Sequence, residues 1–221
     1  MKILFYDVMQ DSSAPCALKS PALSDVYTFE GNAPITIRFS QAVVIDSVGI
    51  GNCNPGTVIS INSVPVTYTG EKGNGLYPLG QSIETNVVSI SVTGGTSIGR
   101  LALGRAIDVP TAVAKEPGIN STAKPRRTLS GQLVPGLGGY SYYSLSLQSK
   151  YKLGKEGIKE IEKGHKYIST GLPFFINLED EAHKLPFKKL YAVEKNQRSL
   201  SLESSIRHYL YSKQWNFKQV F

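Results

Sequence analysis

The first half of the chain is a series of short runs rich in β-branched and aromatic residues, and clusters of Gly, Asn or Pro separate them. Such runs are typical of β-strands, and such clusters are typical of turns. Strands at this spacing predict an antiparallel sandwich or jelly roll. The runs are ILFYDV, VYTF, ITIRF, VVIDSVGI, TVISI, VTYT, VVSISV and RLALGRAI.

One of these runs shows how its strand should be oriented. Ile35, Ile37 and Phe39 are apolar, and the residues between them are polar. This alternation is expected of a strand with one face on a core and the other in water. We therefore predict that Arg38 points outward.

The charge of the chain changes near Pro110. Residues 1–110 contain 6 Lys and Arg against 8 Asp and Glu, whereas residues 111–221 contain 18 against 9, so the net charge changes from −2 to +9. Four prolines and a GLGG run make residues 109–139 irregular, which suits an extended arm or linker. We expect a β-sandwich domain over 1–108, a Pro/Gly-rich arm over 109–139 and a second domain over 140–221.

The second domain combines strand patterns with one helical pattern. YSYYSLSLQSKY, GLPFFINL and KKLYAV predict strands, and the ending SLSLESSIRHYLYSKQWNFKQVF predicts a strand pair. Apolar residues at helical spacing predict a helix near 155–169. The predicted fold class is mainly β, with an N-terminal β-sandwich or jelly roll followed by a β-rich α+β domain that has one main helix.

Neither half contains the residues of a recognisable catalytic or metal site. His165, His183 and His208 are the only histidines, and no G-x-S-x-G motif accompanies them. Glu162 and His165 lack the second pair that a metal site of this kind would need. GEKGNG is interpreted as a turn, because it lacks the Lys-Ser/Thr ending of a phosphate-binding loop. We therefore expect a protein that is not an enzyme and has no catalytic residues, cofactor or metal.

The N-terminal segment and the cysteines carry no targeting or metal-binding signal. MKILFYDV is too short to cross a membrane and precedes no cleavage site, so it is predicted to be a first strand, and no membrane partner is expected. Cys16 and Cys53 are interpreted as two buried thiols in a reducing compartment.

The basic second half suggests three kinds of contact. A pI near 9.3 is compatible with nucleic-acid binding, but many of the Lys residues alternate with Glu or are scattered, which is typical of a solvated face. We therefore do not expect nucleic acid as a partner.

The denser cluster of positive charge is formed by Lys124, Arg126 and Arg127. It is interpreted either as exposed loop charge or as a contact with an acidic partner surface. Aromatic residues fit a strand core or an interface. The candidate interface residues are Lys124, Arg126, Arg127, Tyr140, Tyr142 and Trp215.

The order of these segments resembles minor virion proteins of tailed bacteriophages, in particular tail-tip, baseplate and neck components. The resemblance covers roughly 97–221 and rests on TSIGRLALGRAIDVP, KPRRTLSGQ, YYSLSLQSKYKL, a charged helix, GLPFFINL and WNFKQVF. It implies a structural subunit of the virion, assembled in the host cytoplasm. Such a subunit would act through contacts with other virion proteins and with copies of itself in a ring or another symmetric assembly.

The first hundred residues resemble a galactose-binding-type jelly roll. This resemblance rests on ITIRFSQAVVIDSVGIGNCNPGTVISIN and on RLALG as a later closing strand. It implies an alternative function, a carbohydrate-binding module that contributes to host-surface adhesion, with Tyr77 as the candidate glycan contact. Many domains of this kind bind sugars, but others only pack against neighbouring subunits. An enzyme acting on glycans would need a pair of carboxylates across a cleft, and we interpret Asp46 and Glu84 as turn residues instead.

Overall fold

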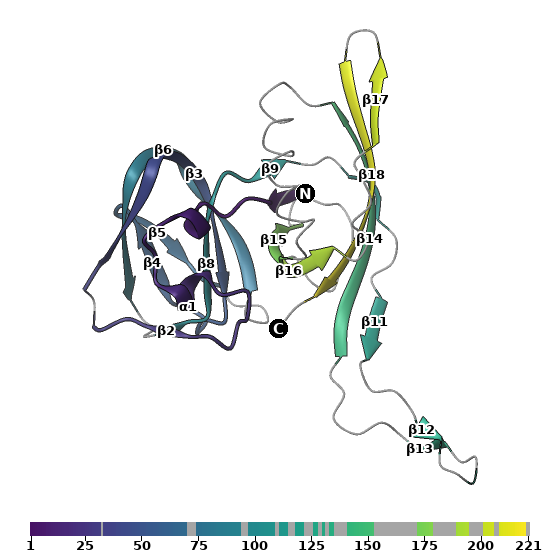
Figure 1. Ribbon diagram of the computed structural model, residues 1–221, viewed down its shortest axis with the longest axis horizontal. Helices are drawn as coiled ribbons and strands as arrows, with labels where there is room; N and C mark the ends of the chain where they lie inside the picture. Colours follow the sequence, from purple (N-terminus) through teal and green to yellow (C-terminus); the bar gives the residue numbers. More distant parts are fainter. Residues whose placement is uncertain are drawn as a thin grey trace.

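The computed structural model describes residues 1–31, 33–69, 74–93, 97–108, 111–114, 118–121, 126–127, 130, 133–134, 141–152, 172–178, 189–194, 201–205 and 208–219. These residues form antiparallel sheets with two short helical segments, η1 (Val8–Asp11) and α1 (Cys16–Lys19) (Figure 1). The predicted mainly β fold is therefore confirmed. The helix predicted near 155–169 lies outside the described residues. No helix within them is long and apolar enough to cross a membrane.

The first part of the chain is a β-sandwich. Its main sheet has the order β5-β4-β6-β3-β8, and β2 and β7 form a small separate pair. The predicted alternation in 35–40 is confirmed, since Ile37 and Phe39 are buried while Arg38 is exposed. The strands are β2 (Tyr27–Thr28), β3 (Ile35–Gly51), β4 (Val58–Ile61), β5 (Val64–Thr67), β6 (Asn74–Thr93), β7 (Ser97–Ile98) and β8 (Arg100–Gly104).

The two longest strands, β3 and β6, are paired with interruptions. On β3, residues 39–42 separate the paired residues Arg38 and Val43, whereas only Asn86 separates their partners on β6. A second irregularity lies between Ile45 and Ser47. Bulges of this kind bend a strand and allow it to contribute to both layers of a sandwich, and Figure 1 shows both strands arching over the top of the sandwich. Both halves of each strand supply the same hydrophobic core.

Three segments predicted as turns are strands instead. Asn74 and Gly75, the end of GEKGNG, begin β6, and this strand continues through Pro78. Proline is tolerated beside a bulge, where ladder hydrogen bonds are already interrupted, and Pro78 pairs with Ser47 next to the second irregularity. Asp46 and Glu84 lie within β3 and β6, because each long strand continues past the position at which its pattern breaks.

The second part of the described chain is a sheet with the order β10-β14-β18-β16-β15-β1-β9. β11 also pairs with β14, β17 pairs with β18, and β12 and β13 pair with each other. The strands predicted in the second half are thus confirmed. The strands are β1 (Lys2–Leu4), β9 (Ile107–Asp108), β10 (Thr111–Ala114), β11 (Gly118–Ser121), β12 (Arg126–Arg127), β13 (Leu133–Val134), β14 (Ser141–Lys152), β15 (Phe174–Asn177), β16 (Lys189–Glu194), β17 (Ser201–Ser205) and β18 (His208–Gln219).

The N-terminal strand belongs to this second sheet. The prediction that MKILFYDV forms a first strand is confirmed, but β1 pairs with β15 on one side and with β9 on the other. The sandwich therefore lies in sequence between two neighbouring strands of the second sheet. The predicted domain boundaries at 108 and 139 remain predictions, and the described parts of the predicted arm are the strands β10 to β13.

Small residues allow the sandwich and the second sheet to approach closely. On β3, Val48 and Ile50 face the sandwich core, whereas a Cβ on Gly49 would lie 2.2 Å from the Phe175 ring of β15. A second buried cluster joins the two parts. It consists of Leu4, Phe175 and Tyr191 from the second sheet, Leu76 and Ala102 from the sandwich, and Leu23 from the segment after α1.

Candidate binding pocket and buried junction

A pocket of about 450 Å³ lies on the sandwich where the β3 bulge meets two other segments. The bulge is held from one side by the segment after η1. The Arg38 backbone N–H donates to Ser13 Oγ (2.8 Å), the Ser13 N–H donates to the Arg38 carbonyl (3.0 Å), and Ser12 forms a β-bridge with Phe39. The lining residues are Tyr6, Val8, Asp11, Phe39, Ser40, Gln41, Ala42, Val43, Val44 and Arg105.

The polar residues of the pocket come from three separate segments. Tyr6 precedes η1 and Asp11 is its last residue, Gln41 lies in the β3 bulge, and Arg105 follows β8. The Tyr6 hydroxyl donates to Asp11 Oδ2 (2.5 Å), which orients both side chains. Nearby, Asp46 Oδ1 accepts a hydrogen bond from the Ala106 backbone N–H (2.8 Å), so the segment that carries Arg105 is attached to β3.

The side chains that line the pocket offer hydrogen-bonding groups. It contains one carboxylate, one guanidinium, a phenol, a hydroxyl and an amide. No histidine, cysteine or second carboxylate lines it, and no group of three or more metal-ligating side chains occurs among the residues that the structure describes. These groups suit binding of a polar ligand.

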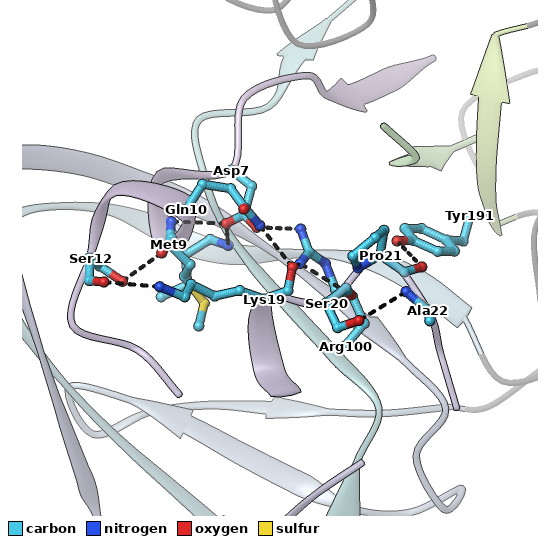
Figure 2. Close-up of polar contacts among 11 residues, drawn as sticks. Asp7, Met9, Gln10, Ser12, Lys19, Ser20, Pro21, Ala22, Arg100 and Tyr191 are labelled. Carbon is cyan, nitrogen blue, oxygen red and sulfur yellow. Dashed lines mark hydrogen bonds and ion pairs between the residues drawn. The ribbon is translucent and has the colours of Figure 1, made fainter. Parts of the chain in front are cut away.

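A buried ion pair forms a separate polar junction below η1 (Figure 2). Arg100 Nη2 of β8 lies 2.6 Å from Asp7 Oδ2, and the side chains are only 4% and 6% exposed. Asp7 Oδ1 also accepts hydrogen bonds from the backbone N–H groups of Met9 and Leu103. Two further donors, from Arg100 Nη1, reach the carbonyl oxygens of Lys19 and Ser20 at the end of α1.

The charge state of Asp7 depends on these contacts. Burial raises the pKa of the Asp7 carboxyl, while the Arg100 guanidinium and the amide donors counteract part of that rise. Without Arg100, desolvation would raise the pKa of the Asp7 carboxyl further, because the guanidinium would no longer lower it. The protonated acid would then be favoured. The junction therefore connects η1, α1 and β8 through a carboxylate whose ionised form is supported by one cation.

The Tyr191 hydroxyl links this region to the second sheet. It donates to the Pro21 carbonyl (3.1 Å), and burial raises the pKa of Tyr191, so the phenol stays protonated (Figure 2). We expect Tyr191→Phe to lower the free energy of unfolding by about 0.5–1.5 kcal/mol, because the hydrogen bond from the Tyr191 hydroxyl to the Pro21 carbonyl is lost. Urea unfolding followed by fluorescence would measure this change. Tyr27→Phe, at a half-buried position in the sandwich, is the control, and equal losses in both variants would contradict the assignment.

The residues predicted as contacts are not brought together in one site among the described residues. Arg126 and Arg127 form β12, and Trp215 lies in β18 opposite Leu147. Tyr142 of β14 is half-buried, and Lys218 Nζ lies 4.6 Å from the centre of its ring. Lys124 and Tyr140 lie outside the described residues.

The candidate glycan contact, Tyr77, lies in the sandwich core. It is 6% exposed, its ring packs against Tyr68, and its hydroxyl accepts a hydrogen bond from the Thr69 backbone N–H (3.3 Å). A glycan would therefore meet very little of this ring. The role assigned to Tyr77 stays a prediction.

The interpretation of both cysteines as buried thiols is wrong for Cys16. This residue begins α1 and is exposed, whereas Cys53 is partly buried, and both are free thiols. The four-residue helix α1 buries only Leu18, so its other side chains remain accessible.

Sequence reasoning missed the pocket residues Tyr6, Asp11, Gln41 and Arg105. One signal was present, because the polar pair Ser40–Gln41 interrupts two apolar strand patterns at the position of the bulge. The other residues become neighbours only when the segments before and after the sandwich strands fold onto β3.

Comparison with known proteins adds little to these observations. No family model matches the chain, and no curated protein does. One similar solved structure is CpGH89CBM32-6 produced by Clostridium perfringens, with 10% sequence identity and a TM-score of 0.35 over 45% of this chain and 99% of that chain. A likeness of this strength carries no argument about function.

Proposed function

We propose that the protein is a structural subunit of a tailed-bacteriophage particle and acts through contacts between subunits. The proposal starts from the resemblance of residues 97–221 to minor virion proteins. It is supported by the long strands and the outlying β12–β13 pair of the second part of the described chain. Its proposed place is the tail, the baseplate or the neck of the particle.

The observation that carries this proposal is the length of the paired strands β14 and β18. Each strand has 12 residues, so at about 3.3 Å per residue each spans roughly 40 Å. Figure 1 shows β11 beside the lower end of β14 and the β12–β13 pair beyond that end, away from the sandwich. A two-stranded pair is marginally stable in water when nothing covers it. A neighbouring subunit would cover such an extension and complete its packing.

The direct test is to look for the protein in particles. We expect mass spectrometry of gradient-purified virions, produced by the phage that encodes this chain, to detect it at a fixed ratio to the major tail or capsid protein. A matched sample from cells lysed without particle assembly controls for carry-over. Absence from the purified virions, or an amount that varies between preparations, would reject the proposal.

The basic strand β12 offers a variant that tests the contact itself. If Arg126 and Arg127 pair with an acidic groove of a neighbour, changing both to Ala should cost roughly 2–5 kcal/mol of assembly energy, because desolvated ion pairs are lost. The variant should fold normally and be depleted from particles, as measured by immunoblotting of purified virions. Arg38→Ala, at an exposed sandwich position, is the control.

Wild-type incorporation of the double variant would return these residues to an ordinary solvated surface, where the loss is about 0–1 kcal/mol. That result would remove the proposed contact but not the proposed function. The mass-spectrometric test addresses the function independently.

A further inference from the structure

A second pocket, which we call the β9 pocket, lies where the sandwich meets the edge of the second sheet. Its volume is about 300 Å³, and it shares no lining residue with the pocket beside the β3 bulge. Its polar lining residues come from strands of both parts of the chain. They are Lys2 of β1, Asp46 and Ser47 of β3, Gln81 and Ser82 of β6, and Asp108 of β9.

One polar side chain of the β9 pocket is buried without a hydrogen-bond partner. Ser47 is only 4% exposed, and within the part of the chain that the structure describes its hydroxyl group makes no hydrogen bond. Ser47 lies on the same face of β3 as Gly49, because strand residues two positions apart share a face. That face is directed toward Phe175 of the second sheet. A buried hydroxyl group without a partner costs free energy, so a polar group that enters the pocket and pairs with it is favoured.

The charges of the β9 pocket favour a cation. Two carboxylates line it, those of Asp46 and Asp108, against one ammonium group, that of Lys2. Asp46 Oδ1 accepts a hydrogen bond from the Ala106 backbone N–H (2.8 Å), which leaves Oδ2 for a further donor. Asp108 Oδ1 lies 3.7 Å from the N-terminal amine, and the side chain is 71% exposed. An exposed ion pair of this kind is weak, so the Asp108 carboxylate can also accept a second cationic group.

The acceptor groups of the β9 pocket fit a guanidinium group. Divalent metal ions prefer several carboxylates, and no group of three or more metal-ligating side chains occurs in the described ranges of the chain. A guanidinium group instead donates up to five hydrogen bonds in one plane. Carboxylate, hydroxyl and amide oxygens that can accept them line the pocket from the neighbouring strands β3 and β6.

The arginines of β12 lie far from the β9 pocket of their own chain. Figure 1 shows β9 beside the N-terminus, whereas the β12–β13 pair lies beyond the lower end of β14. Residues 1–110 carry a net charge of −2 and residues 111–221 a net charge of +9. The second part of one copy therefore attracts the first part of another. A second copy can supply the guanidinium group that the same chain does not place in its pocket.

We infer that the β9 pocket of one copy receives an arginine of β12, Arg126 or Arg127, from a second copy of this chain. This inference rests on the proposed function, since it names the partner of the contact proposed for β12. Adjacent residues of a strand point to opposite faces, so one arginine enters the pocket and the other stays outside it. The contact is heterologous, because β12 and the pocket are different surfaces. Successive copies then form a ring or a filament.

The test is self-association of the full chain, measured by light scattering during size-exclusion chromatography. We expect association at about 100 µM protein and about 50 mM salt, and its loss at about 1 M salt, because salt screens the charges. Asp46→Asn keeps the acceptor for Ala106 and should raise the Kd of association at least about tenfold. Glu84→Gln removes an exposed carboxylate of β6 outside the pocket and is the matched control. Lys2→Gln should lower the Kd, because it removes the competing cation.

Mixing two variants tests the head-to-tail geometry. Asp46→Asn keeps an intact β12, and Arg126→Ala/Arg127→Ala keeps an intact pocket. Each variant alone should be monomeric. A mixture of the two should form a 1:1 complex that grows no further, because only one pocket and one β12 remain to pair. A contact between identical surfaces would not give this result.

Three results would overturn the inference. They are the absence of association by the unchanged protein up to about 500 µM, an equal Kd for Asp46→Asn and Glu84→Gln, and a mixture of the two variants that stays monomeric. Asp108→Asn, at an exposed position, keeps the test decisive if Asp46→Asn fails to fold. Detection of the protein in virions is a separate measurement. A virion protein whose association ignores the pocket would retain the proposed function without this contact, whereas pocket-dependent association of a protein absent from virions would retain the contact alone.

Discussion

Replacing Arg100 with Met is expected to lower the free energy of unfolding by about 3–5 kcal/mol, because it leaves the buried Asp7 carboxyl without its cation. Met keeps much of the length and apolar volume of the arginine stem, so the loss reports the charge and its hydrogen bonds. Asp7 is then supported only by uncharged donors from Met9, Gln10 and Leu103. Chemical denaturation followed by circular dichroism would measure the change. The control Arg38→Met, at an exposed position, should change stability by less than about 0.5 kcal/mol.

The double variant Asp7→Asn/Arg100→Met separates the ion pair from the packing around it. Removing both charges abolishes the uncompensated carboxyl, so the double variant should lose less stability than the sum of the two single variants. Strict additivity would mean that the two side chains contribute independently, and it would contradict the role assigned to the pair.

Replacing Phe175 with Ala is expected to lower the free energy of unfolding by about 3–5 kcal/mol. The ring is 1% exposed, lies against Gly49 of the sandwich and packs on Tyr191 with ring centroids 4.6 Å apart. Its removal leaves a cavity between the sandwich and the second sheet, so the two parts should lose cooperativity. Calorimetry should then resolve two transitions, or a broader one, whereas we expect a single sharp transition for the unchanged protein.

Gly49 provides a matched variant for this interface. Gly49→Ala alone should cost about 1–3 kcal/mol, because the added Cβ would overlap the Phe175 ring. In the Phe175→Ala background the same change should cost far less, since the methyl group then occupies part of the cavity. If Gly49→Ala is equally destabilising in both backgrounds, Phe175 is not the neighbour that limits this position.

Much of the fold could be predicted from local patterns. The alternation of Ile35, Ile37 and Phe39 correctly predicted one buried and one exposed face, and GLPFFINL correctly predicted a buried strand. The extent of β3 and β6 was harder to predict, because bulges and Pro78 interrupt their patterns without ending the strands. The Val-Gly-Ile-Gly sequence of 48–51 indicated a strand, but not that Gly49 faces the Phe175 ring of β15.

The long-range arrangement could not be predicted in this way. Asp7 and Arg100 are 93 positions apart, and the strand partner of Ile3 on β15 is Ile176. Neither pairing has a local signal, because each depends on how complete sheets pack. The same holds for the pocket, whose acid and base lie on opposite sides of the sandwich in sequence. Of the charged residues predicted as contacts, Arg126 and Arg127 lie on β12, and Lys124 lies outside the described residues.

The pairing of β1 with β9 has a consequence for how the protein can diversify. Lys2 lies opposite Asp108 and Ile3 opposite Ile107, so the chain leaves the second sheet and re-enters it at adjacent positions. Insertions whose two ends are close together are tolerated well, because the host keeps its strand order whatever the insert contains. The strand order of the second sheet between β1 and β9 is accordingly compatible with a longer, shorter or different insert at this position.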